Sequence, residues 1–173
     1  MADNGLKSFL TKTAKILSEL KSNKIIDSYG LIGGLAVGAL GIPRATEDVD
    51  FLVSTEKIGD FFPRFTKSLG KGFKTELIKP ERGVFPYYAI LCYQKGYRMM
   101  DILVTTEFLQ DEIAKDTVKI NIAGASIPVV NTEGLVILKL KSGGPMDLID
   151  IKNIFKVIDK NKLDGEKLDN WSK

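Results

Sequence analysis

The spacing of hydrophobic residues in the first part of the chain predicts alternating helices and strands. Apolar residues recur at three- and four-residue steps over residues 5–21 and again over 56–69, which is typical of helices that bury one face. Between them, residues 25–33 read as a short strand, 35–41 as a short helix, and 47–53 as a strand with alternating apolar side chains. The expected order is therefore helix, strand, helix, strand, helix.

The second part of the chain predicts two β-hairpins and three helices. Gln94-Lys95-Gly96 and Ala123-Gly124-Ala125 each separate two β-rich runs, a pattern that favours hairpins. The expected segments are a hairpin at 87–106, a short helix at 107–114, a hairpin at 117–130, and helices at 132–141 and 147–159. The charged C-terminal residues, about 160–173, are expected to form a tail that frays.

These elements indicate an α+β fold in which helices pack on a mixed β-sheet. The 173 residues are 44% hydrophobic and 27% charged, which suits one domain with a buried core at about 28–155. The net charge of +3, from 25 basic and 22 acidic residues, is compatible with a polyanionic partner without requiring one. No run of apolar residues is long enough to act as a signal peptide or to cross a membrane, so we expect a cytoplasmic protein with no membrane partner.

The chain has no histidine and only one cysteine, Cys92. This excludes Ser-His and Cys-His nucleophile pairs, an intrachain disulfide and a cysteine zinc cluster within one chain. Any chemistry must then rest on carboxylates, lysines or a bound metal. Oxygen ligands of this kind suit the hard cation Mg²⁺ better than zinc or copper.

Three aspartates are the leading candidates for such a site. Asp48 and Asp50 lie two residues apart in a strand that is otherwise apolar, and Asp101 lies in another predicted strand. Side chains two positions apart are separated by about 7 Å along a strand, and paired strands lie about 4.8 Å apart. The three carboxylates can therefore converge on one or two Mg²⁺ ions.

Gly33 and Gly34 could supply the phosphate-binding part of the same site. Glycines that enter a helix allow backbone N–H groups to approach a phosphate without obstruction by side chains. With metal on the phosphate oxygens of a nucleoside triphosphate (NTP), a hydroxyl could attack the α-phosphorus, and Asp101 is a reasonable proton acceptor. A tight turn is the simpler explanation of the two glycines when they are considered alone.

The order of these motifs resembles the nucleotidyltransferase superfamily whose fold is shared with polymerase β. The matching segments are GG at 33–34, DVD at 48–50 and MDILV at 100–104. More closely, GGLAVGALGIPRATEDVDFLV and LVILKLKSGGPMDLIDI resemble the small transferases grouped with abortive-infection (AbiEii-type) toxins. That pattern continues with a helical lysine, matched by Lys139, and a closing Asp-x-x-Asp, matched by Asp147 and Asp150. A basic residue commonly precedes this closing pair, whereas the chain has Met146.

The resemblance implies NTP and Mg²⁺ as ligands, with Lys139 reaching the triphosphate and Arg44 and Thr46 as second-tier nucleotide contacts. Simpler explanations exist for each residue. Arg44 and Arg98 could pair with the three aspartates, Arg44 could also pair with Glu47, and Thr46 could merely begin a strand. One of Lys139 and Lys141 is expected to be only solvated. Asp147 and Asp150 could serve a helix N-terminus, where negative charge is favoured, and organise nearby basic groups.

Four tyrosines and Cys92 surround the first predicted hairpin turn. Aromatic residues there could stack on a base or an acceptor, although cross-strand packing is their commoner role. These residues are Tyr87, Tyr88, Tyr93 and Tyr97. Cys92 is expected to be a small buried hydrophobe rather than a nucleophile.

The leading hypothesis is an Mg²⁺-dependent nucleotidyltransferase that moves a nucleoside monophosphate to a hydroxyl. The toxin-like resemblance makes tRNA or another RNA the expected acceptor and a cognate antitoxin protein a possible partner. An antibiotic-modifying transferase of the aminoglycoside or lincosamide kind is the alternative within the same class. A catalytically silent protein that binds nucleotide, RNA or a partner is the alternative from another class.

Overall fold

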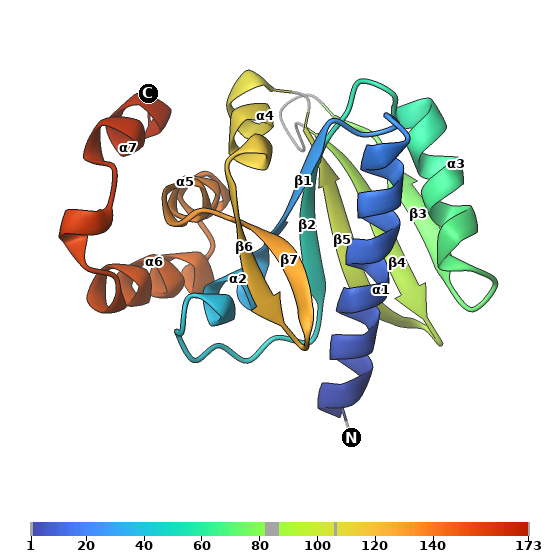
Figure 1. The fold of residues 1–173 in the computed structure, drawn as a ribbon, viewed down its shortest axis with the longest axis horizontal. Coiled ribbons are helices and arrows are strands. Elements are labelled where there is room, and N and C mark those ends of the chain that lie inside the picture. The colour runs from blue at the N-terminus through green and yellow to red at the C-terminus, as the bar shows by residue number, and fades with distance from the viewer. Residues whose placement is uncertain (1, 82–86, 106, 173) are drawn as a thin grey trace.

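The computed structural model describes residues 2–81, 87–105 and 107–172, and their core is a seven-stranded sheet (Figure 1). The strands lie in the order β3-β4-β5-β2-β1-β7-β6. Their bounds are β1 Ser28–Ile32, β2 Val49–Ser54, β3 Lys74–Ile78, β4 Tyr88–Gln94, β5 Tyr97–Val104, β6 Thr117–Ile122 and β7 Ala125–Val130. The helices are α1 Ala2–Ser22, α2 Gly33–Ala39, α3 Ile58–Leu69, α4 Phe108–Lys115, α5 Thr132–Ser142, α6 Pro145–Val157 and α7 Gly165–Ser172.

The sheet is mixed, as the α+β prediction requires. Strand β2 pairs antiparallel with β1 and parallel with β5, and β1 pairs parallel with β7. The two hairpins, β4-β5 and β6-β7, form its other antiparallel pairs together with β3-β4. Their turns place Lys95-Gly96 and Ala123-Gly124 at positive φ, the conformation that two-residue hairpin turns need.

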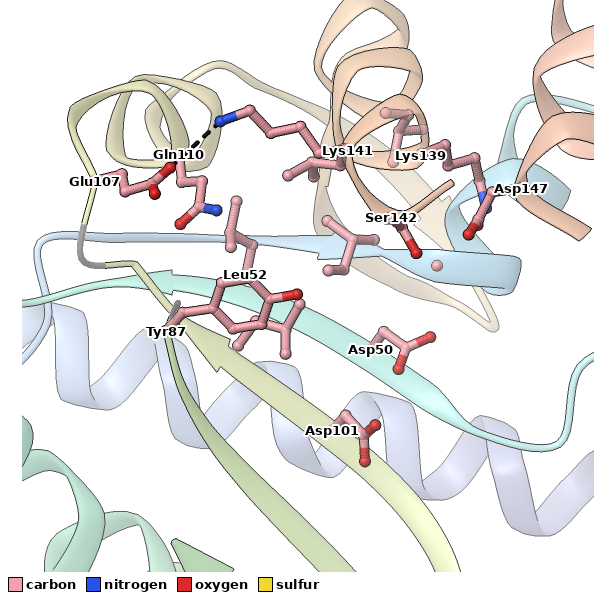
Figure 2. Close-up of a pocket in the computed structure, with 15 residues that line it drawn as sticks. Asp50, Leu52, Tyr87, Asp101, Glu107, Gln110, Lys139, Lys141, Ser142 and Asp147 are labelled. Carbon is pink, nitrogen blue, oxygen red and sulfur yellow. Dashed lines mark hydrogen bonds and ion pairs between the residues drawn. The ribbon is translucent and has the colours of Figure 1, made fainter. Parts of the chain in front are cut away.

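The alternation of side chains along β2 separates a packing face from a polar face. Phe51 is fully buried, and its ring contacts Tyr29, whose hydroxyl donates a hydrogen bond to the Ala14 carbonyl of α1. The odd-numbered residues of β2 therefore face α1. Because neighbouring side chains in a strand point to opposite faces, Asp50 and Leu52 face the side on which α4 and α5 lie (Figure 2).

Two segments differ from the sequence prediction. Strand β3 at the sheet edge was not predicted, because its residues Lys74–Ile78 are mostly polar or half-buried and carry no strong apolar alternation. The predicted C-terminal tail instead contains a short 3₁₀ turn at Lys160–Lys162 and the helix α7, whose Leu168 and Trp171 pack against the core. No helix in the described part of the chain is both long enough and apolar enough to span a membrane.

Candidate active site

Asp50 and Asp101 lie directly opposite each other on adjacent parallel strands. They are register partners in the β2-β5 ladder, so their side chains leave the same face of the sheet. Both line a cavity of ≈ 600 Å³ that also borders Gly33, Lys139 and Asp147 (Figure 2). Two of the three predicted aspartates therefore reach one cavity.

The Asp50 carboxylate lies so close to Gly33 that this position has no room for a side chain. The Gly33 φ of +68° lies in the left-handed region, and a Cβ built on this residue would lie 2.7 Å from Asp50 Cγ. A side chain here would overlap the Asp50 carboxylate, so only glycine fits between the end of β1 and the start of β2. The close approach of Asp50 therefore explains why position 33 is a glycine, whether or not the residue also binds a phosphate.

The surroundings of Asp50 favour its protonated form. Burial, followed by the neighbouring charge of Asp48, raises the pKa of Asp50 to about 7, against the opposing effect of Arg98 and Lys139. A cation bound at this carboxylate would offset both unfavourable effects. Asp50 therefore has the electrostatic character of a side chain that needs a positive ligand.

Asp101 already has a cationic partner. Arg98 Nε donates a hydrogen bond of 2.7 Å to Asp101 Oδ1, and its Nη2 pairs with Oδ2, which makes the contact bidentate. The Arg98 side chain is half-exposed, whereas Asp101 is 8% exposed. The sequence alternative that Arg98 pairs with an aspartate is thus confirmed, at Asp101.

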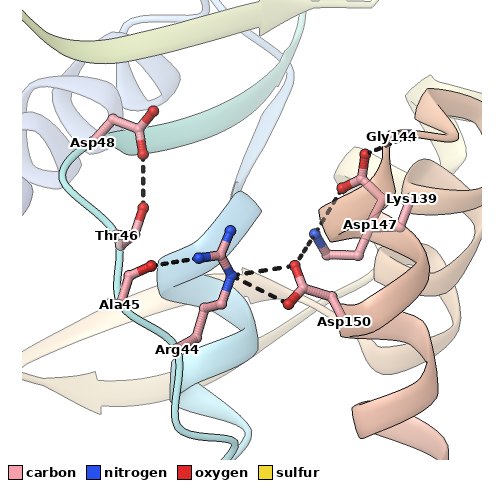
Figure 3. Close-up of polar contacts among 8 residues, drawn as sticks. All are labelled: Arg44, Ala45, Thr46, Asp48, Lys139, Gly144, Asp147 and Asp150. Carbon is pink, nitrogen blue, oxygen red and sulfur yellow. Dashed lines mark hydrogen bonds and ion pairs between the residues drawn. The ribbon is translucent and has the colours of Figure 1, made fainter.

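Asp48 is held just outside strand β2 by Thr46. The Thr46 hydroxyl donates a hydrogen bond of 2.7 Å to Asp48 Oδ1 (Figure 3). Thr46 also packs against Gly34, where an added Cβ would lie 2.9 Å from the Thr46 side chain. Thr46 therefore orients the first aspartate, and Asp48 does not line the cavity that Asp50 and Asp101 share.

Lys139 joins the closing aspartate pair to the cavity wall. Its ammonium donates hydrogen bonds of 2.7 Å to Asp150 and 3.0 Å to Asp147, and the Lys139 residue is only 7% exposed (Figure 3). Arg44 Nε approaches the other oxygen of Asp150 at 3.2 Å. This ion-pair network connects the loop before β2 with α5 and α6, and it places Arg44 on Asp150.

Asp147 lies in the first turn of α6, the position favourable for negative charge. It accepts a hydrogen bond of 3.2 Å from the Gly144 backbone N–H. Burial raises the pKa of Asp147, but hydrogen bonds from Ser142 and Lys139 outweigh it and lower the pKa overall. The prediction that Asp147 and Asp150 serve a helix N-terminus is confirmed for Asp147 alone, since Asp150 lies beyond the first turn, whereas both carboxylates do organise the basic Lys139.

Lys139 and Lys141 lie in different surroundings, although both border the cavity. The half-exposed Lys141 makes a 3.3 Å ion pair with the equally exposed Glu107 (Figure 2). Such an exposed pair is weak and easily exchanged. Lys141 is therefore more free to move onto a ligand than Lys139, which is held by two carboxylates.

The predicted residues divide into two groups. Gly33, Asp50, Asp101, Lys139 and Asp147 line the cavity, whereas Gly34, Arg44, Thr46, Asp48 and Asp150 do not. Among the described residues, no three Asp, Glu, Cys or His side chains stand close enough together to form a metal site. The three-aspartate Mg²⁺ site therefore stays a prediction, for which the in-register Asp50 and Asp101 supply a fitting pair of oxygen donors.

Sequence reasoning missed the far end of the cavity. Glu107 and Gln110, at the start of α4, line it together with leucines from β2, β5 and α5. Of the four tyrosines, Tyr87 alone is among the lining residues. The signal that could have found this end is the register: Leu52 and Leu103 follow Asp50 and Asp101 by two residues, so they share the same face.

Comparison with known proteins identifies the fold. No protein-family model matches the chain, and no curated protein matches its sequence. Several solved structures resemble it, including the following three. An antigenic nucleotidyltransferase-like protein from Paracoccidioides brasiliensis is 20% identical, with a TM-score of 0.56 over 96% of this chain and 84% of its own. ANT(2″)-Ia, solved with adenylyl-2″-tobramycin, is 14% identical, with a TM-score of 0.57 over 95% of each chain.

The third structure, the Megavirus polyadenylate synthase, is 13% identical and has a TM-score of 0.54 over 89% of this chain and 34% of its own. At such low identity these likenesses show the fold alone. The chain has the nucleotidyltransferase fold, as its sequence motifs predicted. The closer resemblance to abortive-infection toxins stays a prediction.

Proposed function

We propose that the chain is an Mg²⁺-dependent nucleotidyltransferase that transfers a nucleoside monophosphate from an NTP to a hydroxyl. The observation that carries the proposal is the in-register pair of Asp50 and Asp101 on one cavity, with Gly33 beside it. The nucleotidyltransferase fold supports the same class of reaction. Proteins on one fold differ in activity, so the site carries more weight than the fold.

Asp48, Asp50 and Asp101 would hold the metal, as a two-ion site. Mg²⁺ at such carboxylates supplies charge stabilisation of phosphate oxygens and activates the attacking hydroxyl. Because the Arg98 side chain is half-exposed, it can move away from Asp101 when a metal ion binds. Thr46 orients Asp48 through its hydroxyl, and Asp101 accepts the proton from the acceptor hydroxyl.

The triphosphate would lie between Gly33 and Lys139, which both border the cavity. In the reaction, a bond forms between the acceptor oxygen and the α-phosphorus, and the bond from that phosphorus to pyrophosphate breaks. Lys139 and the mobile Lys141 provide positive charge for the leaving pyrophosphate. Arg44 and Gly34 contribute indirectly, Arg44 through its ion pair with Asp150 and Gly34 through its packing on Thr46.

For the acceptor we propose an RNA, with tRNA as the first choice, in a toxin–antitoxin or phage-defence setting with a cognate antitoxin. The support is the order of the GG, DVD, Lys139 and Asp147-x-x-Asp150 motifs. A small antibiotic is the second candidate. It is favoured by the full-length match to ANT(2″)-Ia, in which 95% of each chain superposes.

The test is transfer of ³²P from each α-labelled NTP in the presence of Mg²⁺, with tRNA, total protein and an aminoglycoside offered separately. We expect label on one acceptor, and loss of that label in Asp50→Asn and Asp101→Asn. The matched control is Asp60→Asn, since Asp60 is exposed on α3, away from the cavity. Transfer that is equal in all four proteins would exclude this site, and absence of both transfer and Mg²⁺-NTP binding would exclude the function.

A further inference from the structure

Gln110 carries a buried polar atom that the fold leaves without a partner. The residue is 5% exposed, and its Oε1 has no hydrogen-bond partner within the described part of the chain. Buried side-chain oxygens are nearly always hydrogen-bonded, because an unpaired one costs stability. Gln110 also lines the cavity of Asp50 and Asp101. Figure 2 shows its amide pointing from α4 toward the part of the cavity that contains Tyr87.

The amide lies beside apolar side chains and beside the ion pair of Glu107 with Lys141. The cavity is lined here by Tyr87 and by the leucines Leu52, Leu103, Leu135 and Leu138. Leu52 and Leu103 are register partners, two residues beyond Asp50 and Asp101 on the same strands. This places them about 7 Å from the carboxylates along the sheet. The cavity therefore has a carboxylate end at Asp50 and Asp101 and a leucine-lined end, where the unsatisfied amide of Gln110 lies near the Glu107–Lys141 ion pair.

A ligand that matches both ends has an anionic part, a planar apolar ring and a polar edge on that ring. We propose that Gln110 reads the nucleobase of the bound nucleotide, an inference that rests on the proposed transferase function. Its Oε1 accepts a hydrogen bond from an exocyclic amino group, while its Nε2 can donate to the adjacent ring nitrogen. Adenine and cytosine present this amino group next to a ring acceptor on their Watson–Crick edge, where the amino group of guanine instead lies next to a ring N–H. Gln110 is thus a specificity-determining residue that selects ATP or CTP.

Binding of matched nucleotide pairs tests this directly. Calorimetry in Mg²⁺ compares ATP with the triphosphate of purine riboside, which lacks the amino group, and CTP with its analogue that lacks the 4-amino group. We expect one amino-bearing nucleotide to bind about 3–10-fold more tightly than its partner, the range of one neutral hydrogen bond. The pair that shows the difference identifies the base.

Gln110→Leu should abolish this difference and bind both members of the pair with the affinity of the amino-free analogue. Since Oε1 has no partner to lose, the melting temperature of unliganded Gln110→Leu should not fall, which shows that the variant folds. Gln94→Leu is the control, because Gln94 lies at the end of β4 and does not line the cavity.

The outcomes separate this inference from the function on which it rests. If Gln110→Leu folds and keeps the preference, Gln110 does not read the base, although nucleotide binding still stands. A wild-type preference for GTP or UTP would overturn the proposed base. Absence of binding by all four NTPs would overturn the nucleotidyltransferase function and this inference together.

Discussion

The Asp50 carboxylate occupies the space that a side chain at Gly33 would need. An added Cβ would lie 2.7 Å from Asp50 Cγ, and the backbone of Gly33 is in the left-handed region. The glycine motif and the aspartate motif, 17 positions apart in the sequence numbering, are therefore two halves of one contact. A change at Gly33 should act on the site through Asp50.

Gly33→Ala is predicted to destabilise the protein and to displace Asp50. The left-handed backbone alone costs an alanine about 1–2 kcal/mol, and the overlap with Asp50 adds to this cost. Gly41→Ala is the matched control, since Gly41 has φ +83° but no atom within 4 Å of an added Cβ. Thermal unfolding should show a larger loss for Gly33→Ala, together with weaker Mg²⁺-NTP binding. Equal losses in the two variants would show that Asp50 does not constrain position 33.

Lys139→Met is predicted to lower the free energy of unfolding by about 3 kcal/mol. The substitution leaves Asp150, whose side chain is 1% exposed, with only Arg44 as a cationic partner, and breaking a buried ion pair typically costs 3–5 kcal/mol. Urea unfolding measures the change. The double variant Lys139→Met/Asp150→Leu should recover most of the stability, because the buried carboxylate that lost its lysine partner is then also removed.

Lys141→Met is the control for this prediction, because its partner Glu107 is as exposed as Lys141 itself. Its effect on stability should not exceed about 1 kcal/mol. A comparison of NTP binding in the two single variants then shows which lysine contacts the nucleotide. Equal destabilisation by the two changes would contradict the buried network at Lys139.

Local patterns were sufficient to predict most of the strands and to place Asp50 and Asp101 on them. Alternation along β2 placed Asp50 on a polar face, and the two-residue turns defined the hairpins and therefore the position of Asp101 on β5. Asp50 and Asp101 come together because β2 and β5 pair in parallel. The sequence indicated that paired strands could bring the aspartates together, but it did not specify that β2 and β5 form such a pair.

The parts that could not be predicted depend on contacts between distant segments. Arg44 was expected to contact the nucleotide or to pair with Glu47 or Asp48, but α6 brings Asp150 to it across more than a hundred residues of sequence. Gln110 was missed because a single polar residue in a short amphipathic helix looks like a surface residue. Its burial depends on the packing of α4 against β1 and β2, which no pattern within 107–114 reveals.

Cys92 is predicted to be unreactive in the native protein and to make stability fall at high pH. Burial raises the pKa of its thiol to about 12 from 9.0, so the folded state keeps the proton that the unfolded chain releases. The contribution to stability is complete below about pH 9 and is lost as the pH rises toward 12. Thiol labelling should proceed only at the unfolding rate at pH 8. Cys92→Ala should reduce the decrease in stability above pH 9, and rapid native-state labelling would contradict the buried position.

Arg98→Gln is predicted to strengthen binding of a divalent cation. Arg98 now occupies both carboxylate oxygens of Asp101, so an arriving cation must displace it. The Arg98 side chain is half-exposed although Asp101 is buried, and an ion pair worth about 1 kcal/mol corresponds to a gain in Mn²⁺ affinity of about fivefold. Electron paramagnetic resonance of free Mn²⁺ measures it without any turnover. Arg64→Gln on the exposed part of α3 controls for the change in net charge, and weaker Mn²⁺ binding by Arg98→Gln alone would show that the arginine helps to build the site instead of competing for it.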